Sequence, residues 1–272
     1  MRHVRTLPAV APWSASARRL RVRTRDVLAS GVALAALQVA LVGAVATPAQ
    51  AGCTITSDVA PLSSQCDASF VSLRTGAGAT SLLITDMTTV GVDMAPSGMT
   101  TPTSHTLTIG GTTTISNPSY SAVYSQTNAA NHDIAVTLGS GVTITSVGGF
   151  GAVWMRNDTS GNISIDNAAT ITSSGAGAPG ITATTNLGAV TITNSGRVTS
   201  NDDWGIYADG GFNNTAMNPV TVSVTNSGTV SAYKAGIRVI DYHGHAQLTN
   251  TGTVTSTTRQ GLVAWAQTGS TT

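Results

Sequence analysis

The feature that most constrains the fold of this chain is an internal repeat. A residue that is usually apolar opens each copy, and further apolar residues follow it at offsets 2 and 8. Asn or a small residue stands at offset 4, and Gly or another small residue usually stands at offset 6. The pattern occurs six times, as Leu107-Ile109-Gly111-Thr113-Ile115, Val136-Leu138-Ser140-Val142-Ile144, Ile163-Ile165-Asn167-Ala169-Ile171, Val190-Ile192-Asn194-Gly196-Val198, Val222-Val224-Asn226-Gly228-Val230 and Ala246-Leu248-Asn250-Gly252-Val254.

A second pattern keeps the same phase as the first. Between 14 and 17 residues after each start, a small residue precedes a short apolar run. The six runs are Ser121-Ala122-Val123-Tyr124, Gly151-Ala152-Val153-Trp154, Gly180-Ile181-Thr182-Ala183, Gly205-Ile206-Tyr207-Ala208, Gly236-Ile237-Arg238-Val239 and Gly261-Leu262-Val263-Ala264. Because two independent features recur together through six copies, the chain is a repeat protein.

The spacing within each copy indicates β-structure. Alternation with period two, carried by Val, Ile, Leu and Thr, is typical of strands with one buried face. A unit of about 27 residues cannot enclose a core alone, but stacked units can. We therefore expect an all-β parallel β-helix, or solenoid, of about six or seven rungs, with offsets 0, 2 and 8 pointing inward. A helical fold is excluded because no apolar period of about 3.6 residues is present.

Asparagine recurs at offset 4 in the last four copies, as Asn167, Asn194, Asn226 and Asn250. Asn and Gly both tolerate the left-handed backbone of tight turns. Stacked asparagines can also pass amide hydrogen bonds along the solenoid axis. We expect a structural asparagine ladder here. Glycan attachment is the alternative function for Asn-x-Ser/Thr motifs, which occur at Asn157 and Asn162.

The chain carries few charges, and they are unevenly placed. Only 9% of the residues are charged, no glutamate occurs, and seven of the thirteen basic residues are arginines before residue 26. After residue 51, six basic residues face eleven aspartates, which gives a net charge of −5 and a single lysine, Lys234. Nucleic-acid binding needs clustered Lys and Arg and is therefore excluded. Low charge suits a solenoid, because stacking would place like charges in columns.

The first 51 residues have the features of an export signal. A basic stretch that ends at Arg25 precedes the uncharged apolar run 27–46, and a small-x-small motif ends at Ala51. These features predict a cleaved signal peptide, with cleavage between Ala51 and Gly52. The alternative is a transmembrane anchor, for which the run is just long enough.

The two cysteines, Cys53 and Cys66, lie close to the expected new N-terminus. An even pair in an exported protein indicates a disulfide, which would pin the first structural element. A metal or redox pair is the alternative, but the C-x-x-C spacing and a nearby histidine are missing.

The leader, the early cysteine pair and the repeated Asn-Ser/Thr-Gly-x-Val motif together resemble the passenger domains of Gram-negative autotransporters. The resemblance implies a right-handed β-helix, adhesive or stalk-like, at the cell surface or outer membrane or in the extracellular space. It also implies an outer-membrane β-barrel translocator, which this sequence lacks, so we expect a truncated passenger. The expected domains are a signal peptide (1–51), an N-terminal cap with the disulfide and a degenerate rung (52–106), and the incomplete β-helix repeats (107–272).

Several groups were candidates for catalysis, and none forms a recognisable catalytic motif. Asp202, Asp203, Lys234 and Arg259 fall on successive rungs, and an ion-pair column in a turn is favoured over a polysaccharide lyase or glycosidase site. His243 and His245 would share a strand face with Asp241, but the further ligands of a zinc site are missing. We expect a protein that is not an enzyme and holds no metal or cofactor.

The few aromatic side chains near rung positions are candidate contacts for a partner. Tyr207 is expected to point outward between Ile206 and Ala208, as is Arg238 between Ile237 and Val239. Trp154 is expected to share the inward direction of Ala152. Tyr124 and Trp265 complete the set. Exposed aromatics on a flat β-face suit a carbohydrate or protein ligand, here a host-cell, matrix or carbohydrate ligand. The alternative, that they are scattered surface rings without a ligand, is favoured over a binding face.

Overall fold

The computed structural model describes residues 52–57, 63–66, 71–74, 80–94, 104–128, 130–211, 219–267 and 270–272. All of them belong to one compact unit, Ala49–Thr272. The expected signal peptide and the apolar run 27–46 lie outside the described residues. No helix within the described ranges is long and apolar enough to cross a membrane.

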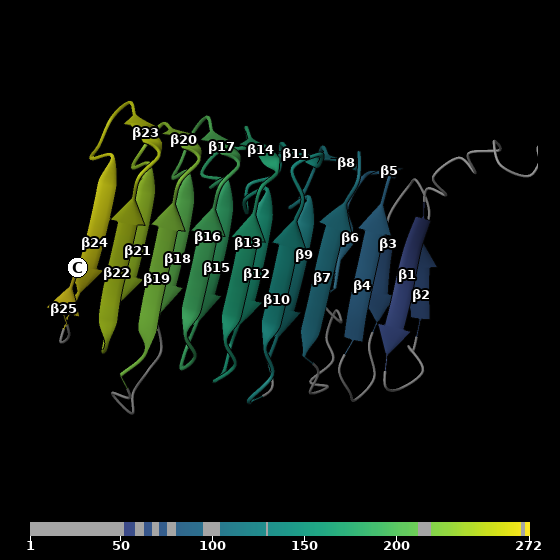
Figure 1. The fold of residues 1–272 in the computed structure, drawn as a ribbon, viewed down its shortest axis with the longest axis horizontal. Coiled ribbons are helices and arrows are strands. Elements are labelled where there is room, and N and C mark those ends of the chain that lie inside the picture. The colour runs from purple at the N-terminus through teal and green to yellow at the C-terminus, as the bar shows by residue number, and fades with distance from the viewer. Residues whose placement is uncertain are drawn as a thin grey trace, which may run out of the picture. The chain divides into compact units, whose positions relative to one another are not determined.

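The described chain folds into three β-sheets (Figure 1). Sheet A contains β1 (Gly52–Ser57), β4 (Thr80–Thr85), β7 (His105–Gly110), β10 (Ile134–Leu138), β13 (Ile163–Asn167), β16 (Val190–Asn194), β19 (Thr221–Asn226), β22 (His245–Asn250) and β25 (Ser270–Thr271). Sheet C contains β5 (Thr88–Thr89), β8 (Thr114–Asn117), β11 (Thr143–Ser146), β14 (Thr170–Ser173), β17 (Arg197–Ser200), β20 (Thr229–Ala232) and β23 (Thr253–Ser256). Sheet B contains β2 (Ser63–Cys66), β3 (Val71–Arg74), β6 (Val92–Asp93), β9 (Val123–Thr127), β12 (Val153–Asn157), β15 (Ile181–Thr185), β18 (Ile206–Gly210), β21 (Ile237–Asp241) and β24 (Leu262–Ala266).

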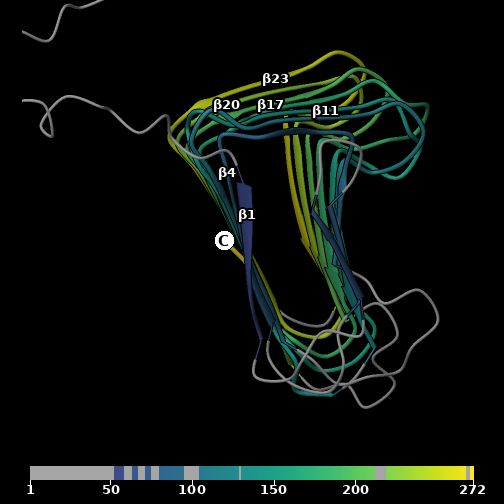
Figure 2. The same ribbon diagram turned by 90° about the vertical axis from the view of Figure 1, so that its right-hand side faces the viewer.

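Each rung contributes one strand to each sheet, in the order A, C, B. From β4 to β22, each strand pairs in parallel with the strand three places later, as β13 does with β16. Seen along the stack, sheets A and B lie opposite each other, and sheet C runs across one side of the space between them (Figure 2). The fold is therefore the predicted all-β parallel β-solenoid, and the described residues contain no helix.

The core is formed by columns of apolar side chains that point into the stack. In sheet A, Ile165 pairs with Ile192, which pairs with Val224, and all three are at most 1% exposed. The strand residues between them face solvent, as the alternating burial of β13 and β16 shows. Burial of the predicted inward positions supplies the hydrophobic stabilisation that a single rung lacks.

The first two predicted copies were placed two residues out of register with the other four. In the structure Leu138 pairs with Asn167, so Leu138 and Ile109, rather than Ser140 and Gly111, occupy the column of the asparagines. The sheet C strands are nevertheless aligned, because Ile144 pairs with Ile171. The reason is a turn that is two residues longer in these rungs, and Gly111 adopts a positive φ of 61° there.

The N-terminal region combines a rung with antiparallel strands. β4, β5 and β6 pair in parallel with β7, β8 and β9, so residues 80–94 form a complete rung. β1 pairs antiparallel with β4, and β2 pairs antiparallel with β3. The terminal strands of sheets A and B, β1 and β2, thus lie beyond this first rung (Figure 1).

Candidate functional site

The outer face of sheet B carries aromatic side chains from four strands, and further aromatic rings pack against them. Its strands bring residues far apart in sequence into two neighbouring columns. The first column is Asp93, Tyr124, Trp154, Thr182, Tyr207, Arg238 and Val263. The second is Gln126, Arg156, Thr184, Asp209, Ile240 and Trp265. We call this surface the sheet B outer face.

The expectation that Trp154 points inward is wrong. Ala152 lies in a bend, the strand begins at Val153, and Val153 and Met155 are fully buried while Trp154 is half-buried on the outer face. Gly151 makes this bend possible, because its φ of 111° is a conformation that favours glycine. Tyr207 and Arg238 lie on the outer face as predicted, between buried neighbours.

Four rings form a continuous stack at one end of the first column. Phe150 stacks on Trp154 with ring centroids 5.2 Å apart and planes at 7°. Tyr120 packs on Phe150 at 5.3 Å, and Tyr124 packs on Trp154 at 4.9 Å. Tyr120 and Phe150 are 60% and 48% exposed, so this stack presents an apolar surface to solvent.

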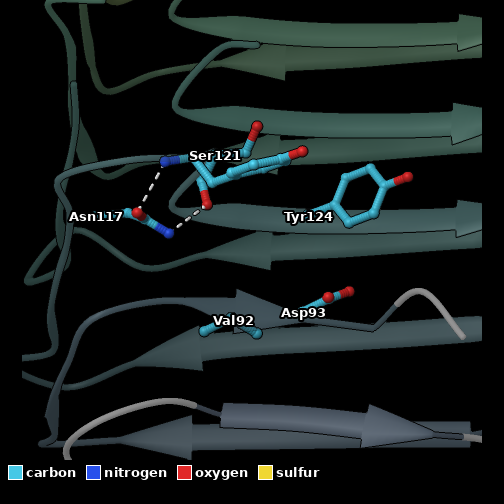
Figure 3. A pocket seen from close by; sticks show the side chains of 6 residues that line it. Val92, Asp93, Asn117, Ser121 and Tyr124 are labelled. Atoms are coloured by element: carbon cyan, nitrogen blue, oxygen red, sulfur yellow. Dashed lines mark hydrogen bonds between the residues drawn. The ribbon is translucent and has the colours of Figure 1, made fainter. Parts of the chain in front are cut away.

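A hollow of about 270 Å³ lies beside the stack (Figure 3). It is lined by Val92, Asp93, Asn117, Tyr120, Ser121 and Tyr124. Asn117 Nδ2 donates to Ser121 O at 3.0 Å, and Asn117 Oδ1 accepts from the backbone N–H of Tyr120 at 2.9 Å. The Asn117 side chain therefore fixes the turn that carries Tyr120, while Asp93 and Tyr124 come from adjacent strands.

A second hollow of about 230 Å³ lies further along the same face. It is lined by Trp154, Arg156, Asn157, Asp158, Thr184, Asn186, Tyr207 and Asp209. Arg156 Nε lies 2.5 Å from Asp158 Oδ1, and Gln126 Nε2 donates to Asp158 Oδ2 at 2.6 Å. We call this hollow the Trp154–Tyr207 hollow.

Asp209 is the most unusual group in the Trp154–Tyr207 hollow. It is 2% exposed, and its Oδ2 accepts a hydrogen bond from the Tyr207 hydroxyl at 2.6 Å. Its Oδ1 is buried with no hydrogen-bond partner among the described residues. Burial raises the pKa of Asp209 to about 6, although the Tyr207 hydrogen bond and Arg238 act in the opposite direction. Burial, followed by the nearby Asp209 carboxylate, raises the pKa of Tyr207.

A cationic cluster lies next to Tyr207. Trp204 stacks on Tyr207 at 4.6 Å, and the Arg238 guanidinium lies 4.7 Å from the centre of the Trp204 ring. Lys234 approaches the same ring at 5.4 Å and forms an ion pair with Asp203, Nζ to Oδ1, at 3.0 Å. These contacts hold both cations against aromatic faces.

Sequence reasoning missed Tyr120, Phe150 and Trp204. Each stands one residue before the small residue that opens the second repeated pattern, at Ser121, Gly151 and Gly205. The phase of the repeat was therefore a signal that could have found them.

The predicted charged column is joined only in part. Asp203 and Lys234 form the expected kind of ion pair in a turn, and the Asp203 side of the pair is buried, at 4% exposure. Asp202 Oδ2 instead accepts from the backbone N–H of Gly177 at 2.6 Å. Arg259 is exposed, and no ion pair involves it within the described part of the chain.

The predicted histidine pair is separated by the chain path. His243 lies in a turn, and the backbone N–H groups of His243 and Gly244 donate to Asp241 Oδ1 at 2.9 and 2.7 Å. His245 begins β22, and its Nδ1 lies 2.7 Å from Ser270 Oγ. Within the described ranges, no group of three His, Cys, Asp or Glu side chains is arranged to hold a metal ion.

The four ladder asparagines lie in one row. Asn167 Nδ2 donates to Asn194 Oδ1 at 2.7 Å, and the bonds from Asn194 to Asn226 and from Asn226 to Asn250 are both 2.6 Å. None of the four has a positive φ, so the left-handed backbone that we expected is absent at these positions. The asparagine side chains instead form the hydrogen bonds that link one rung to the next.

Two further predicted sites lie only partly within the described residues. Cys53 is disulfide-bonded, whereas the side chain of Cys66 lies outside the described residues, so their pairing stays a prediction. Of the expected cleavage pair, Gly52 begins β1 and Ala51 lies outside the described residues.

Residues 53–271 match the family described as the BigA third pectate lyase-like domain. No curated protein and no solved structure matches the chain. The match covers the three-sheet solenoid together with its N-terminal strands, and the chain therefore belongs to the BigA third pectate lyase-like domain family.

Proposed function

We propose that this chain is the exported, surface-displayed β-solenoid passenger of an autotransporter-like protein, and that it adheres to a partner through the sheet B outer face. The observation that carries the proposal is the aromatic stack of Tyr120, Phe150, Trp154 and Tyr124, which leaves large apolar surfaces open to solvent. Exposed aromatic rings supply much of the binding energy in protein recognition sites.

The proposal is for binding without catalysis. Three of the four groups in the charged column that a lyase would use are already engaged in other contacts, because Asp203 pairs with Lys234 and Asp202 accepts a backbone N–H. The remaining member, Arg259, lies exposed in a turn. A glycosidase needs two carboxyl groups facing one another across the bond to be cleaved. Asp158 and Asp209 both line the Trp154–Tyr207 hollow, but Asp158 is held by Arg156 and Gln126.

Adhesion is tested with beads coated with the purified chain and presented to cultured epithelial cells and to immobilised matrix proteins. We expect retention of the wild-type beads and a loss of at least about tenfold for the Tyr120→Ala/Phe150→Ala double variant. Both side chains are largely exposed, so the fold should persist. The matched control is Thr191→Ala/Thr193→Ala, which changes two exposed residues on the outer face of sheet A.

Equal retention of the aromatic double variant and the control would contradict binding through the sheet B outer face. Display is tested separately by the coding sequence downstream of Thr272. A membrane translocator encoded there is the expected result, and an unrelated cytoplasmic domain would contradict display.

A further inference from the structure

The Trp154–Tyr207 hollow exists because small residues separate large ones on neighbouring rungs. In the first column Thr182 lies between Trp154 and Tyr207, and in the second Thr184 lies between Arg156 and Asp209. Adjacent strands are about 4.8 Å apart, so two rungs separate the large side chains by about 10 Å. Because the threonine side chains of the middle rung are small, a space of about 230 Å³ remains between the larger side chains.

The size and the aromatic lining of this space suit one sugar ring. Sites for drug-sized ligands usually measure about 300 to 1,000 Å³, and this hollow is smaller. Trp154 and Tyr207 both line the hollow, from the strands on either side of Thr182. The electron-rich faces of such rings attract the polarised C–H groups on the face of a hexose.

The polar lining matches hydroxyl groups. Asp209 Oδ1 is buried and has no hydrogen-bond partner among the described residues, although it belongs to a side chain that lines the hollow. An unpaired buried oxygen is costly. A hydroxyl both donates and accepts, so it can satisfy an oxygen such as Asp209 Oδ1 while it receives a hydrogen bond from a donor. Arg156 and Asn186 carry such donors at the same hollow.

The charge of the lining favours an uncharged sugar over an acidic one. Arg156 is the one cationic side chain among the residues that line the hollow, and it is paired with Asp158. Asp209 has no cationic partner within ion-pair distance in the described chain. A uronate or sialate would therefore add a second negative charge beside Asp209, while the nearby cation Arg238 lies outside the lining and packs on the Trp204 and Tyr207 rings.

We propose that the Trp154–Tyr207 hollow binds one ring of an uncharged hexose glycan, with Trp154 and Tyr207 contacting the ring and Asp209 accepting from a hydroxyl. This inference rests on the proposed adhesive function and names the ligand class. It departs from the polyuronate that the word pectate in the family description implies.

The test is isothermal calorimetry on the full chain with maltohexaose, cellohexaose and mannohexaose as uncharged probes and hexagalacturonate as the acidic probe. We expect at least one uncharged probe to bind with a Kd of about 1 mM or tighter, and hexagalacturonate to bind at least about tenfold more weakly. Trp154→Ala should weaken binding by at least about tenfold, because it removes one wall.

A second variant distinguishes loss of the sugar site from loss of the fold. Thr184→Tyr fills the hollow with a residue that suits a strand, so it should abolish binding while the thermal midpoint measured by circular dichroism stays close to that of the wild type. Trp265→Ala is the matched control, because Trp265 is also exposed on the sheet B outer face but does not line the hollow. It should bind as the wild type does.

The inference is overturned if no uncharged probe binds at about 10 mM, if hexagalacturonate binds more tightly than all three, or if Thr184→Tyr binds unchanged. The outcome is separable from the adhesion test. Beads that adhere while no hexaose binds or competes leave the adhesive function standing and refute the sugar site. Hexaose binding by a chain whose beads do not adhere supports the site and refutes the adhesive role.

Discussion

Asn194 Nδ2 donates a hydrogen bond to Asn226 Oδ1 at 2.6 Å, across the interface between two rungs of the solenoid. Asn167 and Asn250 extend the row on either side, and the first three side chains are fully buried. Each interior asparagine therefore acts as acceptor for the rung before it and as donor to the rung after it. The ladder couples rungs that otherwise contact one another through backbone bonds and apolar packing.

Asn194→Ala should lower the free energy of unfolding by about 2 to 4 kcal/mol, because it leaves Asn226 Oδ1 buried without its donor and leaves the Asn167 side-chain amide with only the longer 3.5 Å bond to Ala169 O. Urea unfolding measures this change. Asn250→Ala is the control, since Asn250 ends the row and is partly exposed, and it should cost about 1 kcal/mol or less. Equal losses at both positions would contradict cooperation along the ladder.

Gly228→Ala should destabilise the solenoid by about 1 to 3 kcal/mol, because a Cβ at residue 228 would lie 2.0 Å from the Gly196 carbonyl oxygen on the preceding rung. Gly228 has no positive φ, so the effect comes from crowding between turns. At Gly261 the nearest heavy atom would be 3.8 Å away. Gly261→Ala should thus change the thermal midpoint little, and a similar drop in both variants would count against the crowding argument.

Lys234→Met should cost about 1 to 3 kcal/mol, because it leaves the Asp203 carboxylate buried without its ion-pair partner. Lys234 itself is partly exposed, which keeps the loss below that of a fully buried pair. Arg259→Met should stay within about 0.5 kcal/mol of the wild type. Chemical denaturation at neutral pH compares the two, and the prediction fails if Arg259→Met is the more damaging change.

His105 should make the solenoid less stable in acid. It is 1% exposed, its Nδ1 lies 2.7 Å from Ser125 Oγ, and burial, with a smaller contribution from His132, lowers its pKa to about 4 from an ordinary value of 6.5. Because the unfolded chain binds this proton more readily, stability falls as the pH drops from 6.5 to 4, by up to about 3 kcal/mol. His105→Gln should flatten this dependence in urea titrations at several pH values. If the pH dependence of stability is unchanged in His105→Gln, that dependence comes from other titrating groups.

Titration of Asp209 should change the stability of the solenoid with pH in the direction opposite to that of His105. Its pKa is raised from 3.8 to about 6, so the folded chain holds this proton more tightly than the unfolded chain does. Its contribution to stability is therefore lost as the pH rises from 3.8 to 6, by up to about 3 kcal/mol. Asp209→Asn should be more stable than the wild type at pH 7 and about equal to it at pH 4. A variant that is less stable at pH 7 would show that the ionised form is stabilised by contacts in the folded chain.

The opposed effects of His105 and Asp209 also predict how the wild type behaves. Between pH 4 and 6 the two contributions have opposite signs and similar size, so they should largely offset each other there. Each single variant should reveal the slope of the group that remains. This comparison checks both assignments with one set of unfolding curves.

The sequence by itself determined the solenoid, because a core built by stacking requires the same inward positions to recur in every rung. Ile165, Ile192 and Val224 could be assigned to one buried column from their spacing alone. The asparagine row could be predicted for the same reason. Local spacing did not reveal that the turns after Ile109 and Leu138 are two residues longer, and this difference shifted the first two copies out of register.

Only the tertiary structure decided which side chains meet on the sheet B outer face. The direction of Trp154 depends on the bend at Gly151 and Ala152, which moves the start of strand alternation by one residue. The Trp154–Tyr207 hollow depends on which rung places Thr182 and Thr184 between large neighbours, and that follows from register across strands. The inward positions can be predicted from the repeat, because the same positions are buried in each rung. The outer face differs from rung to rung, so its contacts are set by the three-dimensional stacking.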